Sequence, residues 1–180
     1  MDTMYQKELN SWKKICILNP HNLSEKEISE LPVYFGTRTV ILVDDDKVVL
    51  IKSTKSNYYV LVGGSIEEGE TIEQGLIREC KEESGYDISI ISPLGYIELC
   101  KKKYKRIIFG FLVKAVGEPT ELLLTEEEKE LGHTVYICPM DEAITLLKND
   151  VKKGVFVKDN LAAIRSLMFL EEAEKYLKKC

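Results

Sequence analysis

Three glutamates, Glu79, Glu82 and Glu83, lie within five residues of one another in the segment GSIEEGETIEQGLIRECKEESGY, from Gly64 to Tyr86. On a helix, with roughly 100° between successive residues, they share one side, and each like-charged pair costs roughly a few tenths of a kcal/mol. A solvated helix face would account for such a cluster, since surface helices are commonly charged. A divalent-cation site would account for it too, because carboxylate oxygens are ligands of Mg²⁺ and Mn²⁺, and a bound cation makes the clustering favourable.

The same segment predicts the helix that carries these glutamates. Thr71 and Gln74 have the spacing of a capping box, and Gly85 lies where a left-handed residue ends a helix. A glycine inside a helix costs roughly 0.5–1 kcal/mol relative to alanine, so Gly75 indicates that another group approaches closely there. Four apolar side chains form one arc that we expect to pack on a sheet: Ile72, Leu76, Ile77 and Cys80.

Strands and helices are predicted from Thr37 onward. The runs rich in β-branched and aromatic residues predict strands: TRTVILV, KVVLIKS, NYYVLV, YDISII, GYIEL, RIIFGFLVKAV and TVYIC. The other segments predict a short helix closed by Pro32, a loop or short frayed helix in TEEEKELG, and a helix in MDEAITLLKN. Asp159 is expected to cap a final helix, whose apolar pattern runs from Leu161 to Leu177. This order favours one α/β layered domain over residues 37–180, with residues 1–36 as an N-terminal extension that packs on it.

The composition is that of a folded protein with an acidic balance. The 180 residues are 44% hydrophobic and 31% charged, with a net charge of −5. A basic surface for duplex nucleic acid is therefore missing, and we expect no nucleic-acid partner. The sequence has no apolar run that could span a bilayer and no N-terminal signal pattern. Its five cysteines are widely spaced without a C-x-x-C pair, which argues against a disulfide framework or a zinc site and favours a reducing, cytoplasmic location.

Seven positions fit one longer pattern, G-x5-E-x7-R-E-U-x-E-E-x-G-U with U apolar: Gly64, Glu70, Arg78, Glu79, Glu82, Glu83 and Gly85. This pattern resembles the signature of the Nudix hydrolases. The resemblance implies an α/β/α sandwich around a central mixed sheet. It also implies metal-dependent hydrolysis of a diphosphate bond in a small nucleotide-type substrate, with Mg²⁺ or Mn²⁺ as cofactor. The substrate would be a nucleoside diphosphate linked to another moiety: an NTP or dNTP, or a nucleotide sugar such as ADP-ribose.

The resemblance also assigns roles to the glutamates of the pattern. Glu79, Glu82 and Glu83 would hold the metal, with help from the backbone carbonyl group of Gly63 or Gly64. This arrangement suits the chemistry, because a diphosphate repels both carboxylates and hydroxide until bound metal ions neutralise its charge.

Arg78 and Glu70 are expected to pair and to fix the preceding loop against the helix. Because this pairing supports the metal-binding glutamates, Arg78 is counted among the expected catalytic residues. The general base remains open at this point. Glu83 is one candidate, and His133 is a weaker one. A glutamate of the later acidic segment is another, with Glu127 and Glu128 favoured among these: Glu126, Glu127, Glu128 and Glu130.

Substrate contacts are expected outside the pattern, from Arg38, Tyr59, Lys103 and Arg106. The segment KKKYKR is locally basic; it either attracts phosphate groups or protects an edge strand. Two other functions remain open within the family: a non-catalytic nucleotide-binding module that regulates a partner, and an isomerase of isoprenoid diphosphates. Members of the family are often dimers, so a homodimer is a further expectation.

Overall fold

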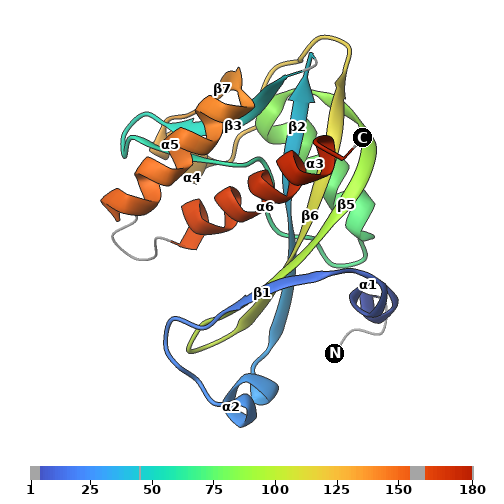
Figure 1. Cartoon of the computed structure of the whole chain (residues 1–180), viewed down its shortest axis with the longest axis vertical. Coiled ribbons are helices and arrows are strands. Elements are labelled where there is room, and N and C mark those ends of the chain that lie inside the picture. The colour runs from blue at the N-terminus through green and yellow to red at the C-terminus, as the bar shows by residue number, and fades with distance from the viewer. Residues whose placement is uncertain (1–4, 45, 155–160, 180) are drawn as a thin grey trace.

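The computed structural model describes residues 5–44, 46–154 and 161–179, so the predicted cap Asp159 lies outside the described residues. Within these ranges the chain forms one mixed sheet of seven strands (Figure 1). The strands lie in the order β1-β5-β6-β2-β3-β4, and β7 pairs with β3. Their bounds are β1 Lys14–Leu18, β2 Val33–Val43, β3 Lys47–Ser53, β4 Tyr58–Val60, β5 Asp87–Cys100, β6 Lys105–Val116 and β7 His133–Pro139.

The sheet is mixed because two strand pairs are parallel, β1 with β5 and β2 with β6, whereas the remaining pairs are antiparallel. The predicted strands YDISII and GYIEL are joined in the single strand β5. Its ladder with β6 is irregular between Ile90 and Ser92 and again between Pro93 and Gly95. A bulge tolerates a proline, since the bulged residue need not donate to the ladder.

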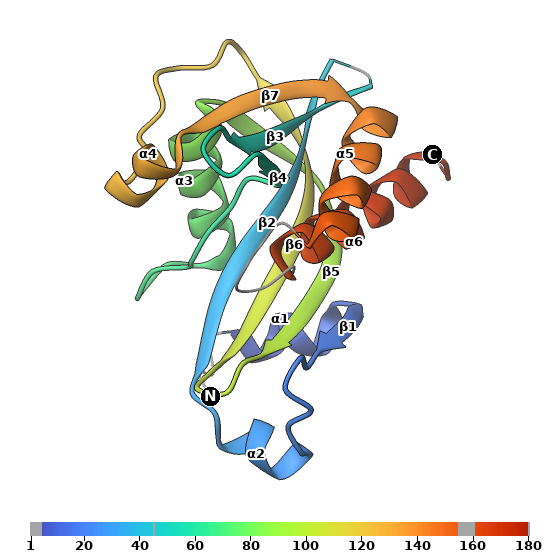
Figure 2. The same cartoon turned by 90° about the vertical axis from the view of Figure 1, so that its left-hand side faces the viewer.

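Helices cover both faces of the sheet. Figure 2 shows α3 on one side and α5 and α6 on the other, so the predicted α/β/α sandwich is confirmed. The helix bounds are α1 Gln6–Ser11, α2 Glu25–Glu30, α3 Ile72–Ser84, α4 Glu126–Leu131, α5 Met140–Lys153 and α6 Leu161–Leu177. Among the described helices, none combines the length and apolar character needed to cross a membrane.

Strand alternation divides the core into two clusters. On β2, Val40 and Leu42 belong to the cluster under α5 and α6, whereas Ile41 belongs to the cluster under α3. The parallel partner β6 alternates in the same way. Gly110 of β6 lets Phe169 of α6 lie directly on the strand, because a Cβ added at Gly110 would come 2.2 Å from the Phe169 ring. Even-numbered positions of β2 and β6 therefore face α6.

The buried arc of α3 differs from the expected one at a single position. Leu76 and Cys80 are buried as expected, but Ile77 is 49% exposed. The arc is shifted toward the acidic side of the helix, so that Glu79 and Glu83 are buried and Ile77 falls at the opposite edge.

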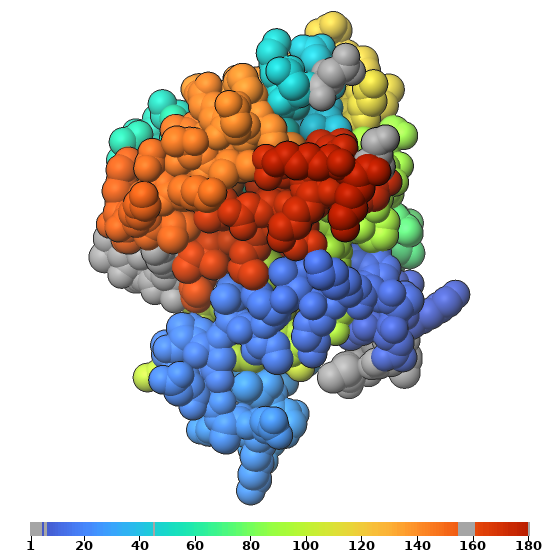
Figure 3. Space-filling view, viewed as in Figure 1, coloured from blue at the N-terminus to red at the C-terminus, as the bar shows by residue number. Residues whose placement is uncertain are grey.

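The N-terminal residues form part of the sheet and of the core. Strand β1, which the sequence did not predict, pairs with β5 at one edge of the sheet, and Figure 3 shows the N-terminal segment on the surface below α6. The Trp12 ring meets Phe109 and Phe111 edge-on, with ring centroids 5.2 and 5.0 Å apart. Strand β2 begins at Val33, so the boundary drawn after residue 36 falls inside this strand.

Candidate active site

A cleft of about 560 Å³ lies between α3 with its preceding loop on one side and α4 with β7 on the other. Ten of the predicted site residues line it: Arg38, Gly63, Gly64, Arg78, Glu79, Glu82, Glu83, Arg106, Glu127 and Glu128. Three predicted residues do not: Glu70, Tyr59 and Lys103. Of the other base candidates, His133 lines the cleft, whereas Glu126 and Glu130 do not. The structure thus brings together most of the predicted site from segments that are far apart in the sequence.

A second hollow of about 610 Å³ lies between α2 and the loop before α3. Its walls include the aromatic side chains of Tyr5, Tyr34 and Phe35, but none of the α3 glutamates. We therefore place the candidate chemistry in the cleft beside α3.

The glutamates of α3 lie at two depths. Glu79 and Glu83 are only 9% and 8% exposed, while Glu82 is half-buried. The backbone N–H of Gly63 donates to Glu83 Oε2 at 2.6 Å. Burial raises the pKa of both buried carboxyls, that of Glu83 to about 8, although the positive charge of Arg38 acts against the shift at Glu83. The cleft therefore holds carboxyl groups that are costly to ionise without a nearby cation.

Arg78 connects the loop to these glutamates. Its Nε and Nη2 donate to Glu70 at 2.7 and 3.0 Å, and Nη2 also donates to the Ser65 carbonyl oxygen at 2.9 Å. Its Nη1 donates to Glu79 Oε1 at 3.0 Å and to Glu82 Oε2 at 3.1 Å. The hydrogen bond from Arg78 lowers the pKa of Glu70, so this carboxyl stays ionised at neutral pH.

Glycines allow the loop to lie directly against its neighbours. At Gly63, which has φ +129°, an added Cβ would come 2.5 Å from the Thr37 carbonyl oxygen. At Gly64 it would come 2.5 Å from Glu79 Oε1. The Gly64 carbonyl oxygen accepts a hydrogen bond from the Thr37 N–H at 3.0 Å. At Gly75 the expected close neighbour is the loop itself, since an added Cβ would lie 3.2 Å from Glu70 Oε2.

The opposite wall brings two further groups to Glu83. Ligand atoms of Glu83, Glu128 and His133 all lie within 4.8 Å of one another. Burial acts to raise the pKa of Glu128, but hydrogen bonds with Thr125 and Glu83, together with the electrostatic effect of His133, outweigh it and the pKa is lowered. Burial lowers the pKa of His133, and the Tyr58 hydroxyl lies 3.4 Å from its Nε2. At neutral pH this wall therefore offers an ionised carboxylate and a neutral imidazole.

Tyr59, predicted as a substrate contact, lies on the side of β4 that faces away from the cleft. Neighbouring strand residues point to opposite faces, so Tyr58 lines the cleft while the Tyr59 ring packs on Tyr136 at 5.3 Å. Lys103 is exposed in the turn between β5 and β6 and lies outside the cleft, because the basic segment forms the end of this hairpin.

Comparison with known proteins gives a consistent picture. The family model described as NUDIX domain matches residues 34–159. "Uncharacterized Nudix hydrolase YvcI" of Bacillus subtilis (strain 168) is 42% identical over 53 residues, which are 29% of this chain and 32% of that protein. "ADP-ribose pyrophosphatase" of Methanocaldococcus jannaschii is 40% identical over 58 residues, 31% of this chain and 34% of that protein. The chain thus matches about a third of the length of each of these two curated relatives.

A solved structure shows the same fold. The NUDIX hydrolase from Nitrosomonas europaea superposes with a TM-score of 0.59 at 20% identity, covering 80% of this chain and 89% of that one. The matched family model includes β2 except its first residue, the whole acidic helix α3 and both walls of the cleft. The chain therefore belongs to the NUDIX domain family.

Proposed function

We propose that this protein hydrolyses a diphosphate bond in a nucleoside diphosphate linked to another moiety, in a reaction that needs Mg²⁺ or Mn²⁺. The observation that carries the proposal is the burial of Glu79 and Glu83 in a cleft that also contains Arg38 and Arg106. Buried carboxylates suit a metal site and arginines suit phosphate oxygens, so the two kinds of charge together suit a metal-bound diphosphate.

The side chains of α3 fit a hard divalent cation. Glu79, Glu82 and Glu83 offer only oxygen atoms, which Mg²⁺ and Mn²⁺ prefer. Beside Glu79 Oε1, Gly64 leaves open the space that a Cβ would fill. A metal bound there would neutralise the diphosphate and lower the pKa of a bound water.

The other residues of the cleft have separate tasks in this proposal. Arg38 and Arg106 bind phosphate oxygens and stabilise negative charge as the bond breaks. Glu128 accepts the proton of the attacking water, because it faces Glu83 and its lowered pKa keeps it ionised at neutral pH. Glu127 also lines the cleft and is the alternative base.

A substrate panel tests the proposal. The panel contains NTPs, dNTPs and nucleotide sugars including ADP-ribose, the compound named for the relative from Methanocaldococcus jannaschii. Each substrate is incubated with Mg²⁺, with Mn²⁺ or with EDTA, and nucleoside monophosphate is measured. We expect turnover with metal only, and a loss of about a hundredfold or more in Glu82→Gln.

The matched control is Glu73→Gln, which removes an exposed carboxylate from the same helix outside the cleft and should keep full turnover. Binding of nucleotides without any turnover across the panel would overturn hydrolysis in favour of the non-catalytic module.

A cytoplasmic location is part of the same proposal and is supported by the free thiols of Cys16, Cys80, Cys100 and Cys138. A homodimer and the lack of a nucleic-acid partner stay predictions, which light scattering and a gel-shift assay would check.

A further inference from the structure

Arg165 of α6 is a buried cation without a counter-charge in the described part of the chain. Arg165 is only 9% exposed, and its Nε has no hydrogen-bond partner. No described carboxylate lies within ion-pair distance of its guanidinium, although the same helix pairs Glu172 with Lys13. Burial, together with the charges of Arg38 and Arg106, lowers the pKa of Arg165 to about 9. Such a group is unfavourable for folding unless an anion joins it.

The three arginines come from separate elements and share one face of the sheet. Arg38 on β2 and Arg106 on β6 are even-numbered positions, and these face α6. On α6, Ala162 lines the cleft, and Arg165 follows three residues later on the same side of the helix. Arg38 and Arg106 thus line the cleft itself, and Arg165, which is not part of its lining, lies beside it on the α6 side.

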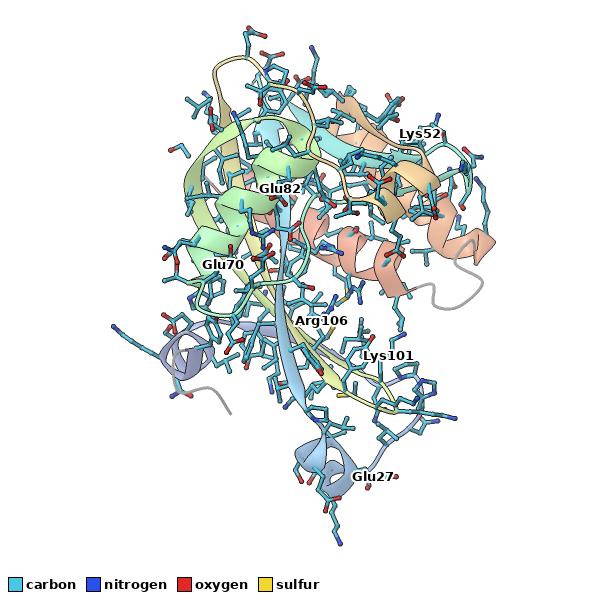
Figure 4. All side chains as sticks on the ribbon, turned by 180° about the vertical axis from the view of Figure 1, so that it is seen from behind. Glu27, Lys52, Glu70, Glu82, Lys101 and Arg106 are labelled. Atoms are coloured by element: carbon cyan, nitrogen blue, oxygen red, sulfur yellow. The ribbon has the colours of Figure 1, made fainter. Side chains whose placement is uncertain are left out.

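A fourth cation extends the positive region along the hairpin. Burial lowers the pKa of Lys101, and the charge of Arg165 adds to this shift. In the view of Figure 4, Arg106 lies between the α3 side, where Glu70 and Glu82 are, and the hairpin end, where Lys101 is.

The arginines retain donors for a ligand. Arg38 Nη1 donates to the Thr37 carbonyl oxygen at 2.9 Å, and Arg106 Nη2 donates to Ser65 Oγ at 3.2 Å. The Nε of Arg106 has no partner. A guanidinium carries five N–H donors in a planar fork that matches phosphate geometry, so most of these donors remain for phosphate oxygens.

We propose that Arg38, Arg106 and Arg165 bind a phosphate group of the substrate beyond the diphosphate held at α3, which makes the substrate a nucleoside triphosphate. The inference rests on the proposed function for the position of the diphosphate. Arg38 joins the two regions, because its charge acts on Glu83 as well as on Arg165. A nucleotide sugar would present hydroxyl groups here and leave the arginine charges unbalanced.

Binding of inorganic tripolyphosphate in EDTA, measured by calorimetry, tests the pocket without activity. We expect Arg165→Met, which keeps the length of the apolar stem, to bind tripolyphosphate about tenfold more weakly than the wild type. Arg165→Lys keeps the positive charge but not the planar guanidinium, so its affinity for tripolyphosphate should lie between those of Arg165→Met and the wild type. Lys26→Gln, which removes an exposed lysine of α2 outside the cleft, should bind like the wild type. Equal affinity in Arg165→Met and the wild type would overturn the proposal.

A second measurement keeps the test valid if Arg165→Met folds poorly. Without ligand, this variant should melt a few degrees above the wild type, since an unbalanced buried charge is removed, and tripolyphosphate should stabilise it less. A lower melting temperature together with unchanged stabilisation by tripolyphosphate would count against the pocket.

Kinetics then separate this inference from the proposed function. In Arg165→Met, kcat/KM should fall about tenfold for nucleoside triphosphates and stay unchanged for ADP-ribose. Equal losses for both substrates would show that Arg165 contacts the shared diphosphate and would overturn the substrate class. If the protein hydrolyses only ADP-ribose, and Arg165→Met does not change this activity, the inference is refuted while the proposed hydrolase function is kept. Arginine-dependent binding of tripolyphosphate without turnover of any substrate would refute the hydrolase and retain the anion pocket.

Discussion

The Arg78 guanidinium donates to both carboxylate oxygens of Glu70, from Nε at 2.7 Å and from Nη2 at 3.0 Å. Glu70 belongs to the loop and Arg78 to α3, so this bidentate pair fixes the loop against the helix that carries the acidic cluster. The same guanidinium reaches Glu79 and Glu82 through Nη1. The orientation of two proposed metal ligands therefore depends on a residue outside the cleft.

Glu70→Gln should lower turnover about 10- to 100-fold while the fold is kept. The amide has only one oxygen, so it cannot accept both hydrogen bonds from the Arg78 guanidinium as the carboxylate does. Arg78 is then held less firmly, and Glu79 and Glu82 lose their orientation. Metal titration and kcat measure the effect, and circular dichroism checks the fold. Glu68→Gln, an exposed carboxylate in the same loop, is the control. Normal metal affinity in Glu70→Gln would contradict a positioning role for the pair.

Glu83 should make the metal-free protein less stable as the pH rises. Its pKa is raised from 4.5 to about 8 in the folded state, so between these values the folded protein holds a proton that the unfolded chain releases. The stability from this proton is complete below pH 4.5 and is lost as the pH rises through 8. Glu83→Gln cannot ionise, so its free energy of unfolding should fall less than that of the wild type.

Urea unfolding in EDTA at pH 5 and pH 8.5 checks this prediction. The difference between wild type and Glu83→Gln isolates one carboxyl group from the others that titrate in the same range. Parallel pH profiles for the two proteins would show that Glu83 ionises freely and would remove the physical reason for placing a cation beside it.

Most of the acidic side of the cleft could be predicted from the sequence, because it depends on spacing within one helix. The capping box at Thr71 and the left-handed Gly85 fix the ends of α3, and helix geometry then places Glu79, Glu82 and Glu83 on one side. The depth of burial could not be predicted in this way. It depends on how the loop and β2 pack against the helix, and the exposed Ile77 shows that the buried arc was misplaced.

The basic side of the cleft was harder to predict, since it depends on the pairing of distant segments. Arg38 and Arg106 were expected as substrate contacts, but Arg165 was not, because it stands in an apolar helical pattern that reads as core. Tyr58 and Tyr59 could not be told apart without knowing which face of β4 meets the cleft. Strand β1 was missed for a similar reason: five residues, KICIL, gain a partner only through parallel pairing with β5.

Two neighbouring glycines should respond differently to alanine. At Gly64 an added Cβ meets the end of the flexible Glu79 side chain, so the carboxylate can move aside. We expect Gly64→Ala to remain folded but to lose metal affinity and turnover by about tenfold or more. At Gly63 the Cβ would meet the Thr37 backbone at φ +129°, so Gly63→Ala should instead lower the melting temperature.

Isothermal titration with Mn²⁺ and thermal melts compare the two glycine variants. Unimpaired Mn²⁺ binding in Gly64→Ala would argue against a metal ligand role for Glu79, since its displaced carboxylate would then make no difference.

Glu128→Gln and Glu127→Gln should separate the two candidates for the general base. Glu128 faces Glu83 and His133, so its loss should reduce kcat by about 10²- to 10⁴-fold with little change in metal affinity. Glu127→Gln should have a smaller effect, because its carboxylate belongs to no such cluster in the described structure. The pH–rate profile is the measurement: its acidic limb should disappear in Glu128→Gln. A larger loss in Glu127→Gln would reverse the assignment.

Trp12→Ala tests whether residues 1–36 are a separable extension of the domain. The Trp12 ring meets Phe109 and Phe111 of β6, and its neighbour Tyr5 donates from its hydroxyl to the Glu70 carbonyl oxygen at 2.6 Å. Since Trp12 is partly exposed, the substitution should cost about 2 kcal/mol, less than for a fully buried tryptophan. We expect one cooperative unfolding transition in both proteins, shifted to lower urea in Trp12→Ala. If instead the variant loses a separate early transition while the main one stays in place, the N-terminal residues form an independent layer and the extension is the correct description.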